Sequence, residues 1–211
     1  MIPLFTYIPL PHLPQIPEKF IKQGMALIES GTAIDQNLHN KELHVNTPEY
    51  LTRKIIKNGV EMPTRGQASY FLGEEWESWV RENIHPRSFD TGIRLSIGTS
   101  TQHGAHVDNP GKLRFYYLVE RGGEEATTIW YMKPGAPIVY NGDTENRNCP
   151  YTENNMDELI EIDRTQFPIG QWVLFNGYVL HGVENVTGRR VNFNVSVKPW
   201  DCEFNINLPS K

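Results

Sequence analysis

The stretch that decides the fold runs from His181 to Lys198 and reads HGVENVTGRRVNFNVSVK in one-letter code. After Arg190 its residues alternate strictly between apolar and polar side chains. The apolar positions are Val191, Phe193, Val195 and Val197, and the polar ones are Arg190, Asn192, Asn194 and Ser196. Period-two alternation of this kind predicts a β-strand over 190–198. We expect its apolar face to pack on helices and its polar face to look into a β-barrel.

Alternation and Gly, Pro and Asn punctuation extend upstream as far as about Arg94, which predicts further short strands. We expect them at 93–99, 113–119, 127–131, 138–140 and 171–175. The polar segment 141–167 is a long excursion between strands, and such excursions are often lids or binding loops. Its acidic stretch, 157–163, either closes over a substrate or is a solvated face.

The first 85 residues carry helical patterns instead. Apolar spacing predicts helices over 17–30 and 74–84, the second with a stripe that includes Trp76 and Trp79. A third helix is expected from Thr47-Pro48, an N-cap followed by proline, to the stop signal Asn58-Gly59. Residues 1–14 contain four prolines and predict an extended arm laid on the domain. Helices first and strands afterwards indicate a mainly β member of the α+β class.

Composition limits the kinds of protein that the chain can be. The 211 residues include nine Phe, nine Tyr and five Trp, as in a folded globular domain. A net charge of −5 with no basic run argues against a general nucleic-acid-binding module. The sequence contains no apolar stretch of 18 residues, so no membrane span is predicted. Cys149 and Cys202 allow one disulfide, although two free thiols in the cytoplasm are favoured, so a cytoplasmic location is expected.

Two histidine contexts carry chemistry. In His106-Val-Asp108 the first and third side chains of an extended chain point to the same side, so an imidazole and a carboxylate can converge. His181 follows another predicted strand and its turn. Two histidines and one carboxylate form the facial triad of non-haem Fe(II) sites, which leaves positions open for other ligands. The alternative is a loop histidine beside an unrelated aspartate, because a His-x-Asp triplet alone is a weak signal.

Arg190 lies nine residues after His181, on the polar face of the strand over 190–198. A guanidinium on an inward face needs an anion, and its fork of donors suits a carboxylate bound beside the metal. The alternative is that Arg189 and Arg190 are both surface residues of a turn.

These residues together resemble the Fe(II)/2-oxoglutarate-dependent dioxygenases, most closely the prolyl 4-hydroxylase branch. The resemblance covers 93–200, through His106-Val-Asp-Asn-Pro110, Tyr116-Tyr-Leu118, His181 and Arg190. It implies that His106, Asp108 and His181 hold Fe(II), that Arg190 binds the far carboxylate of 2-oxoglutarate, and that Tyr117 assists. Asn192, where a serine is common, can also donate to that carboxylate. The gap after His106 is short, so Tyr116 is the alternative inward tyrosine.

Residues 112–116 and 170–181 are also similar to the aspartyl/asparaginyl β-hydroxylases, a branch that lacks the carboxylate ligand present here as Asp108. The implied fold is a double-stranded β-helix, or jelly roll, over 93–211. Residues 1–92 would supply the arm and the supporting helices of the same domain.

The implied activity is hydroxylation of an amino-acid or peptidyl side chain, using O₂ and 2-oxoglutarate and releasing succinate and CO₂. Arg114 would either bind an acidic substrate or face solvent. Two alternatives stay open: a cupin-like metalloenzyme that does not use 2-oxoglutarate, and a non-catalytic jelly-roll binding module. The cupin would not need Arg190. No nucleic-acid or membrane partner is expected, and the sequence does not define an oligomeric state.

Overall fold

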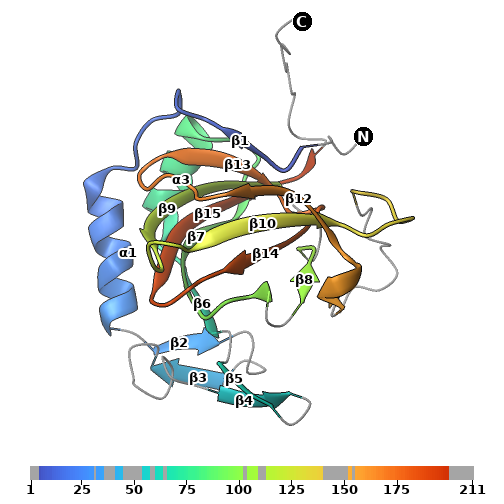
Figure 1. Cartoon of the computed structure of the whole chain (residues 1–211). Helices are drawn as coiled ribbons and strands as arrows, with labels where there is room; N and C mark the ends of the chain where they lie inside the picture. The colour runs from blue at the N-terminus through green and yellow to red at the C-terminus, as the bar shows by residue number, and fades with distance from the viewer. Residues whose placement is uncertain are drawn as a thin grey trace, which may run out of the picture.

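Two antiparallel β-sheets, a separate hairpin and two α-helices make up the part of the chain that the structure, a computed structural model, describes. The described residues are 5–30, 32–35, 41–44, 54–57, 60–63, 66–101, 104–108, 113–139, 152–153 and 155–199. The two sheets stack face to face (Figure 1). The predicted mainly β form of the α+β class is therefore confirmed. Among the described residues, no helix is long and apolar enough to cross a membrane.

The larger sheet has the strand order β1-β13-β9-β15-β7-β6-β2-β3. Its strands are, in that order, Tyr7–Pro9, Trp172–Asn176, Leu113–Arg121, Arg190–Val197, Phe89–Ile97, Gly66–Tyr70, Thr32–Asp35 and Lys41–His44. The strands predicted at 93–99, 113–119, 171–175 and 190–198 are confirmed as β7, β9, β13 and β15. The alternating strand β15 lies between β9 and β7 and is buried along its whole length.

The smaller sheet has the order β11-β8-β14-β10-β12. Its strands are Thr152–Glu153, Ala105–His106, Leu180–Glu184, Thr127–Met132 and Ile160–Thr165. Strand β10 confirms the prediction at 127–131. From β7 to β15 the chain passes from one sheet to the other at most connections, and only β10, β11 and β12 follow one another in the same sheet. Residues far apart in sequence therefore line one interior between the sheets.

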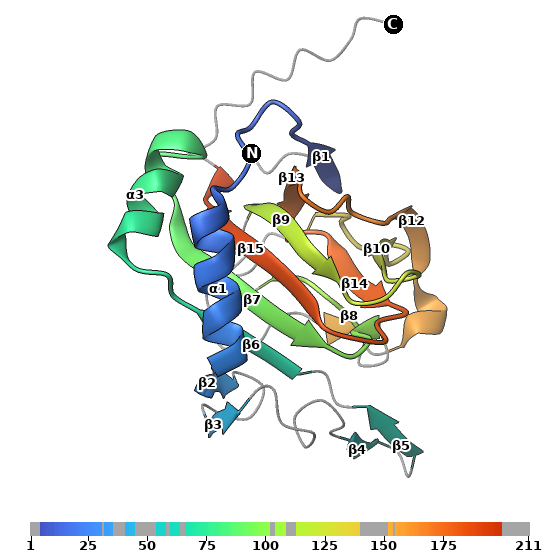
Figure 2. The ribbon, with the colours of Figure 1, turned by 90° about the vertical axis from the view of Figure 1, so that its left-hand side faces the viewer.

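The helices α1 (Glu18–Ser30) and α3 (Glu74–Asn83) pack on the outer face of the larger sheet. Figure 2 looks onto α1 where it crosses this sheet. Both match the helices predicted at 17–30 and 74–84. The buried residues of this layer come from the helices and from the outer faces of the strands, and include Phe20, Ile28, Trp76, Val80, Leu95, Val191, Phe193 and Val195. The outward face predicted for β15 is thus confirmed.

Trp76 is the centre of this layer and is fully buried. Its ring lies 5.0 Å from the ring of Phe193 on β15, 5.3 Å from Phe20 on α1 and 5.5 Å from Trp79. Replacement of Trp76 by Ala should lower the free energy of unfolding by about 3–5 kcal/mol, because a large cavity forms where helices and sheet meet. Urea denaturation measures this loss. A change below about 1 kcal/mol would contradict the packing described.

The predicted N-terminal arm is confirmed over the described residues from 5 onward. Strand β1 pairs antiparallel with β13, which adds the arm to the edge of the larger sheet. Side chains fasten it as well: the indole Nε1 of Trp172 donates to the Pro14 carbonyl at 2.9 Å, and Asn176 Nδ2 donates to the Phe5 carbonyl at 2.8 Å. The arm therefore covers the edge at which β13 would otherwise be unpaired.

The prediction that the first 85 residues are mainly helical is wrong, because β1 to β6 lie there. The helix expected from Thr47 to Asn58 is contradicted where the structure describes it. Residues Lys54–Lys57 form β4, which pairs with β5 (Val60–Pro63). Two adjacent β-branched isoleucines favour a strand. Asn-Gly, interpreted as a helix stop, is also the preferred dipeptide of two-residue hairpin turns. Thr47 lies outside the described residues.

The excursion at 141–167 contains more regular structure than predicted. Its acidic part, 157–163, falls in a short 3₁₀ turn (η3, Met156–Glu158) and in β12, the edge strand beside β10. Its carboxylates pair with nearby cations, Glu161 with Arg164 and Glu158 with Lys133. This part of the excursion is thus a solvated sheet edge. The strand expected at 138–140 is reduced to one bridge, from Val139 to Val179, and both cysteines lie outside the described residues.

Candidate metal centre

His106 and His181 meet because their strands pair. β8 and β14 are antiparallel neighbours in the smaller sheet, and the two histidines are direct partners in the register. Asp108 follows two residues after His106, and its backbone N–H donates to the Gly177 carbonyl at 2.8 Å. Val107, between them, packs into a separate apolar cluster of the smaller sheet. The predicted convergence of His106, Asp108 and His181 is therefore realised.

The loop before β8 is fastened directly beside His181. Ser100 N–H donates to the Val183 carbonyl at 2.8 Å, and the Val183 N–H donates back to Ser100 Oγ at 2.6 Å. Gly182 makes this approach possible, since a Cβ there would lie 2.6 Å from Cγ2 of Thr101. Any side chain next to the histidine would therefore force Thr101 to shift, and glycine lets the loop pack here without that shift.

The three side chains form one group of donor atoms. One ligand atom from each residue lies within 4.8 Å of the others, and the two histidine rings have centroids 4.5 Å apart. His181 Nε2 lies 3.9 Å from Asp108 Oδ1. His181 Nδ1 lies 2.8 Å from the Val179 carbonyl, to which it donates in the tautomer that directs the Nε2 lone pair toward Asp108. A carbonyl behind a ligating histidine is the usual arrangement in metal sites.

Asp108 is held as a carboxylate. Burial would raise the pKa of its carboxyl group, but the positive charge of Arg114 and the neighbouring histidines lower the pKa more, to about 2. Arg114 Nε lies 3.0 Å from Asp108 Oδ2, yet the two groups are not oriented for a hydrogen bond. Arg114, whose direction the sequence left open, thus points into the interior. Asp108 is ionised at neutral pH and able to bind a cation.

The donor set fits a divalent metal. Two imidazoles and one carboxylate on one side of a buried space match the facial triad, and a fourth protein ligand, which would indicate structural zinc, is not among the described residues. The buried Asp108 Oδ2 has no hydrogen-bond partner among the described residues. The ion pair with Arg114 offsets the charge on this oxygen, and Asp108 Oδ1, 3.9 Å from His181 Nε2, is the carboxylate oxygen on the side of the histidine. The group can therefore bind a metal, although the three residues alone do not identify which one.

Arg190 lies in the same cavity and is buried, with 5% of its surface exposed. Its guanidinium donates from Nε to Tyr116 Oη at 3.1 Å, from one terminal nitrogen to the Arg121 carbonyl at 3.0 Å, and from the other to Thr128 Oγ1 at 3.3 Å. These partners are all neutral. Within the described part of the chain, no carboxylate pairs with Arg190. A buried cation with only neutral partners is costly unless an anion joins it.

The orientation predicted for Tyr117 is wrong. Tyr117 points toward the helices, where its ring packs on Trp172 and its hydroxyl donates to Gln15 Oε1 at 2.6 Å. Burial there raises the pKa of its phenol. Tyr116, the alternative, lines the cavity and contacts Arg190. The reason is strand parity: β9 places Arg114 and Tyr116 on the inner face and Phe115 and Tyr117 on the outer one.

The two tyrosines give a matched pair of variants. The resemblance implies that Arg190 binds 2-oxoglutarate, and on that expectation Tyr116→Phe, which removes a hydroxyl beside Arg190, should raise the KM for 2-oxoglutarate about tenfold, as for one hydrogen bond to a charged group. Tyr117→Phe removes a hydroxyl on the other face and should leave that KM unchanged. Steady-state kinetics on both proteins check this. Equal effects of the two variants would contradict the assignment of the inner face.

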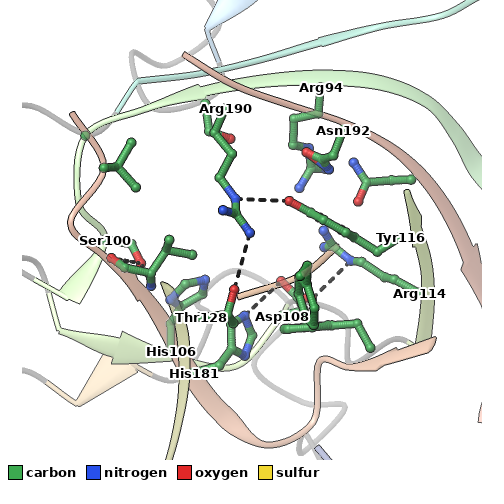
Figure 3. A pocket seen from close by; sticks show the side chains of 17 residues that line it. Arg94, Ser100, His106, Asp108, Arg114, Tyr116, Thr128, His181, Arg190 and Asn192 are labelled. Carbon is green, nitrogen blue, oxygen red and sulfur yellow. Dashed lines mark hydrogen bonds and ion pairs between the residues drawn. The ribbon is translucent and has the colours of Figure 1, made fainter. Parts of the chain in front are cut away.

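The cavity between the sheets measures about 90 Å³, several times the space that one water needs. Figure 3 shows the three candidate metal ligands, His106, Asp108 and His181, at its lower end, and Arg190, Arg94 and Asn192 at the opposite end. Phe175 lines it as well, with its ring 4.6 Å from that of His181. Asn192, predicted on the inner face, is therefore in the cavity together with the proposed ligands.

Thr128 and Arg94 are among the lining residues that the sequence analysis did not single out. Thr128 holds Arg190, and Arg94 lies opposite Asn192 in the pairing of β7 with β15. Strand alternation contained a signal for Arg94, because the apolar residues Ile93 and Leu95 flank it as Val191 and Phe193 flank Asn192. Thr128 carries no comparable signal, since a threonine in a strand is ordinary.

Comparisons with known proteins do not assign the chain to a family. No family model and no curated protein matches the sequence. Among solved structures the chain is similar to E. coli ycfD, with 14% sequence identity and a TM-score of 0.36, over 66% of this chain and 34% of that one. The chain thus spans about a third of the length of that neighbour. A likeness at this level is too weak to define a shared fold or function.

Proposed function

We propose that this protein is an Fe(II)- and 2-oxoglutarate-dependent dioxygenase that hydroxylates an amino-acid or peptidyl side chain. The observation that carries the proposal is the pairing of two features in one cavity. His106, Asp108 and His181 offer three metal ligands on one side, and Arg190 offers a buried guanidinium that no described carboxylate neutralises. A dicarboxylic co-substrate satisfies both, since one end can bind the metal and the other can bind the arginine.

The strand order supports a jelly roll as the finer description of the fold. The four strands β13-β9-β15-β7 of the larger sheet face β8-β14-β10-β12 of the smaller one, and the chain alternates between these two sets except between β10 and β12. Two facing four-stranded sheets connected in this way are the arrangement of an eight-stranded jelly roll. In it the two histidine-bearing strands are neighbours, and the arginine-bearing strand lies in the facing sheet.

The chain's own residues would bind, orient and exclude water. His106, Asp108 and His181 would hold Fe(II), which when bound supplies the oxidation of a C–H bond by O₂ coupled to conversion of 2-oxoglutarate to succinate and CO₂. Arg190 would fix the far carboxylate of the co-substrate, with Tyr116 as an additional donor. Phe175 and its aromatic neighbours would keep water from the reacting end of the cavity.

Turnover tests the proposal. The protein is incubated with Fe(II), 2-oxoglutarate and air, and succinate is measured with and without a pool of amino acids and peptides. We expect succinate that depends on Fe(II) and a product heavier by one oxygen atom. A cupin-like enzyme would oxidise its substrate without forming succinate, and a binding module would form neither. Either of these results would contradict the proposal.

A further inference from the structure

Arg114 enters the cavity beside the candidate metal ligands. It lies on the inner face of β9, and 11% of its side chain is exposed. Figure 3 shows its guanidinium next to Asp108, the residue with which it forms an ion pair. Within the described part of the chain, the guanidinium makes no hydrogen bond. A guanidinium has five N–H donors, so a nearly buried one without acceptors indicates that a ligand with acceptor atoms belongs beside it.

The charges in the walls of the cavity favour an anionic ligand. Among the described lining residues, Asp108 is the one carboxylate, and the guanidinium groups of Arg114 and Arg190 exceed it by one positive charge. A divalent metal and the doubly charged 2-oxoglutarate cancel each other, so this excess remains when both are bound. Arg94 lines the cavity too, with its Nε bound to Ser69 Oγ, and the excess exists with or without the charge of Arg94.

Metal binding would leave Arg114 with less of its counter-ion. Its Nε lies 3.0 Å from Asp108 Oδ2, and this carboxylate would share its negative charge with the metal. Arg190 would hold the far carboxylate of the co-substrate, so the remaining positive charge falls at Arg114. A buried charge without a full counter-ion is costly, and an anionic group of the substrate would therefore stabilise the loaded site.

Asn194 offers an acceptor on the neighbouring strand β15. It is the direct cross-strand partner of Tyr116, and Arg114 is the partner of Ser196, two residues further along. Asn194 and Arg114 are therefore diagonal neighbours in the pairing of β9 with β15, and both line the cavity. Asn194 is buried, with 6% of its surface exposed, and its Oδ1 has no hydrogen-bond partner among the described residues. This oxygen needs a donor, which an N–H of the substrate would supply.

On the basis of the proposed dioxygenase function, we propose that Arg114 and Asn194 bind the substrate through a carboxylate and an N–H that lie close together in it. The carboxylate accepts from the terminal nitrogens of Arg114, and the N–H donates to Asn194 Oδ1. Because Arg114 lies beside the candidate metal ligand Asp108, the oxidised carbon is only a few bonds from this carboxylate. A free α-amino acid has this combination of groups, as do the last residue of a peptide and an acidic residue within one.

Binding, rather than turnover, tests this inference. The probes are free amino acids, tripeptides of uncharged residues with free C-termini, and tripeptides blocked at both ends with a central aspartate or glutamate. Each acid is paired with the carboxamide that replaces its carboxylate, and saturation-transfer NMR is recorded on protein loaded with Zn(II) and 2-oxoglutarate. We expect members of one acid set to bind at least about tenfold more strongly than their carboxamides, because the charged hydrogen bonds are lost in the amides. The responding set identifies the source of the carboxylate.

Variants assign the binding to this site. Arg114→Gln should weaken binding of the acids about tenfold or more, and Arg114→Lys should retain part of it, since lysine keeps the charge without the fork. Asn194→Leu removes a buried oxygen that has no partner, so it should weaken the acids about fivefold without lowering the free energy of unfolding. It serves if Arg114→Gln does not fold. Arg164→Gln, on the exposed strand β12, is the control and should bind like the wild type.

Thermal unfolding with and without Zn(II) separates binding of the substrate from a role in positioning Asp108. The rise in melting temperature that Zn(II) causes should persist in Arg114→Gln, because all three candidate ligands remain. Loss of this rise would mean that Arg114 acts only through the metal ligand, and would overturn the inference.

Three further results would overturn it: equal binding of acids and carboxamides, no binding by any acid, or undiminished acid binding in either Arg114→Gln or Asn194→Leu. These results differ from failure of the proposed function. That failure would appear as absence of Fe(II)-dependent succinate in the turnover test, whatever the NMR shows.

Discussion

His181→Ala should abolish metal binding and turnover while leaving the fold intact. Two ligands bind the ion more weakly than three. Removal of a residue that only supports a metal ligand lowers metal affinity by up to about 100-fold, and removal of a ligand itself should lower it by more. The ring is buried against Phe175 at the edge of the cavity, so the substitution leaves a small space and removes no strand pairing. The same loss is expected for His106→Ala.

Thermal unfolding with and without Zn(II) or Mn(II) measures this loss independently of activity. A metal that binds only the folded state raises the melting temperature. The wild type and His12→Ala, which removes an exposed histidine of the arm, should both show the rise. His181→Ala should show none. A metal-dependent rise of wild-type size in His181→Ala, or retained turnover, would contradict the role given to this histidine.

Arg190→Gln should raise the KM for 2-oxoglutarate by about 30-fold or more. Truncating one partner of a buried, hydrogen-bonded charge pair costs at least about 2 kcal/mol of binding free energy, which corresponds to that factor. Glutamine keeps a donor near Thr128 but loses the charge and the fork. Metal binding should persist in this variant, because His106 and His181 lie on the smaller sheet and Asp108 lies two residues after β8, all away from β15.

Arg189→Gln is the matched control. Arg189 directly precedes β15 and does not line the cavity; it pairs with Glu29 at 2.6 Å and with Glu120. Its replacement should leave the KM unchanged. Similar effects of the two substitutions would mean that Arg190 acts only as a structural residue.

Local alternation predicted the parts of the site that lie on one strand. The pattern of β15 separates Val191 and Phe193 from Arg190 and Asn192, and the structure places the two sets on opposite faces. The same signal failed for the tyrosines. In 113–119 two tyrosines are adjacent, so no difference in polarity shows which of them faces inward.

Non-local pairing was beyond the sequence. No local pattern near His106 indicates that its strand pairs with that of His181. The two histidines were grouped because, with Asp108, they complete a known set of metal ligands, and the resemblance to a family supported that grouping. The N-terminal hairpins were missed for a related reason. Isolated strands of four residues carry too few alternations to be distinguished from a helical turn, and only their pairing partners stabilise them.

One measurement tests the central claim, which is that a metal and a 2-oxo acid bind together in the cavity with Arg190. Fe(II) and 2-oxoglutarate are added to the protein without oxygen, and the visible spectrum is recorded. We expect the metal-to-ligand charge-transfer band of an iron-bound 2-oxo acid, weakened in Arg190→Gln and absent in His181→Ala. A wild-type protein that gives no such band at saturating concentrations of both ligands would contradict the account.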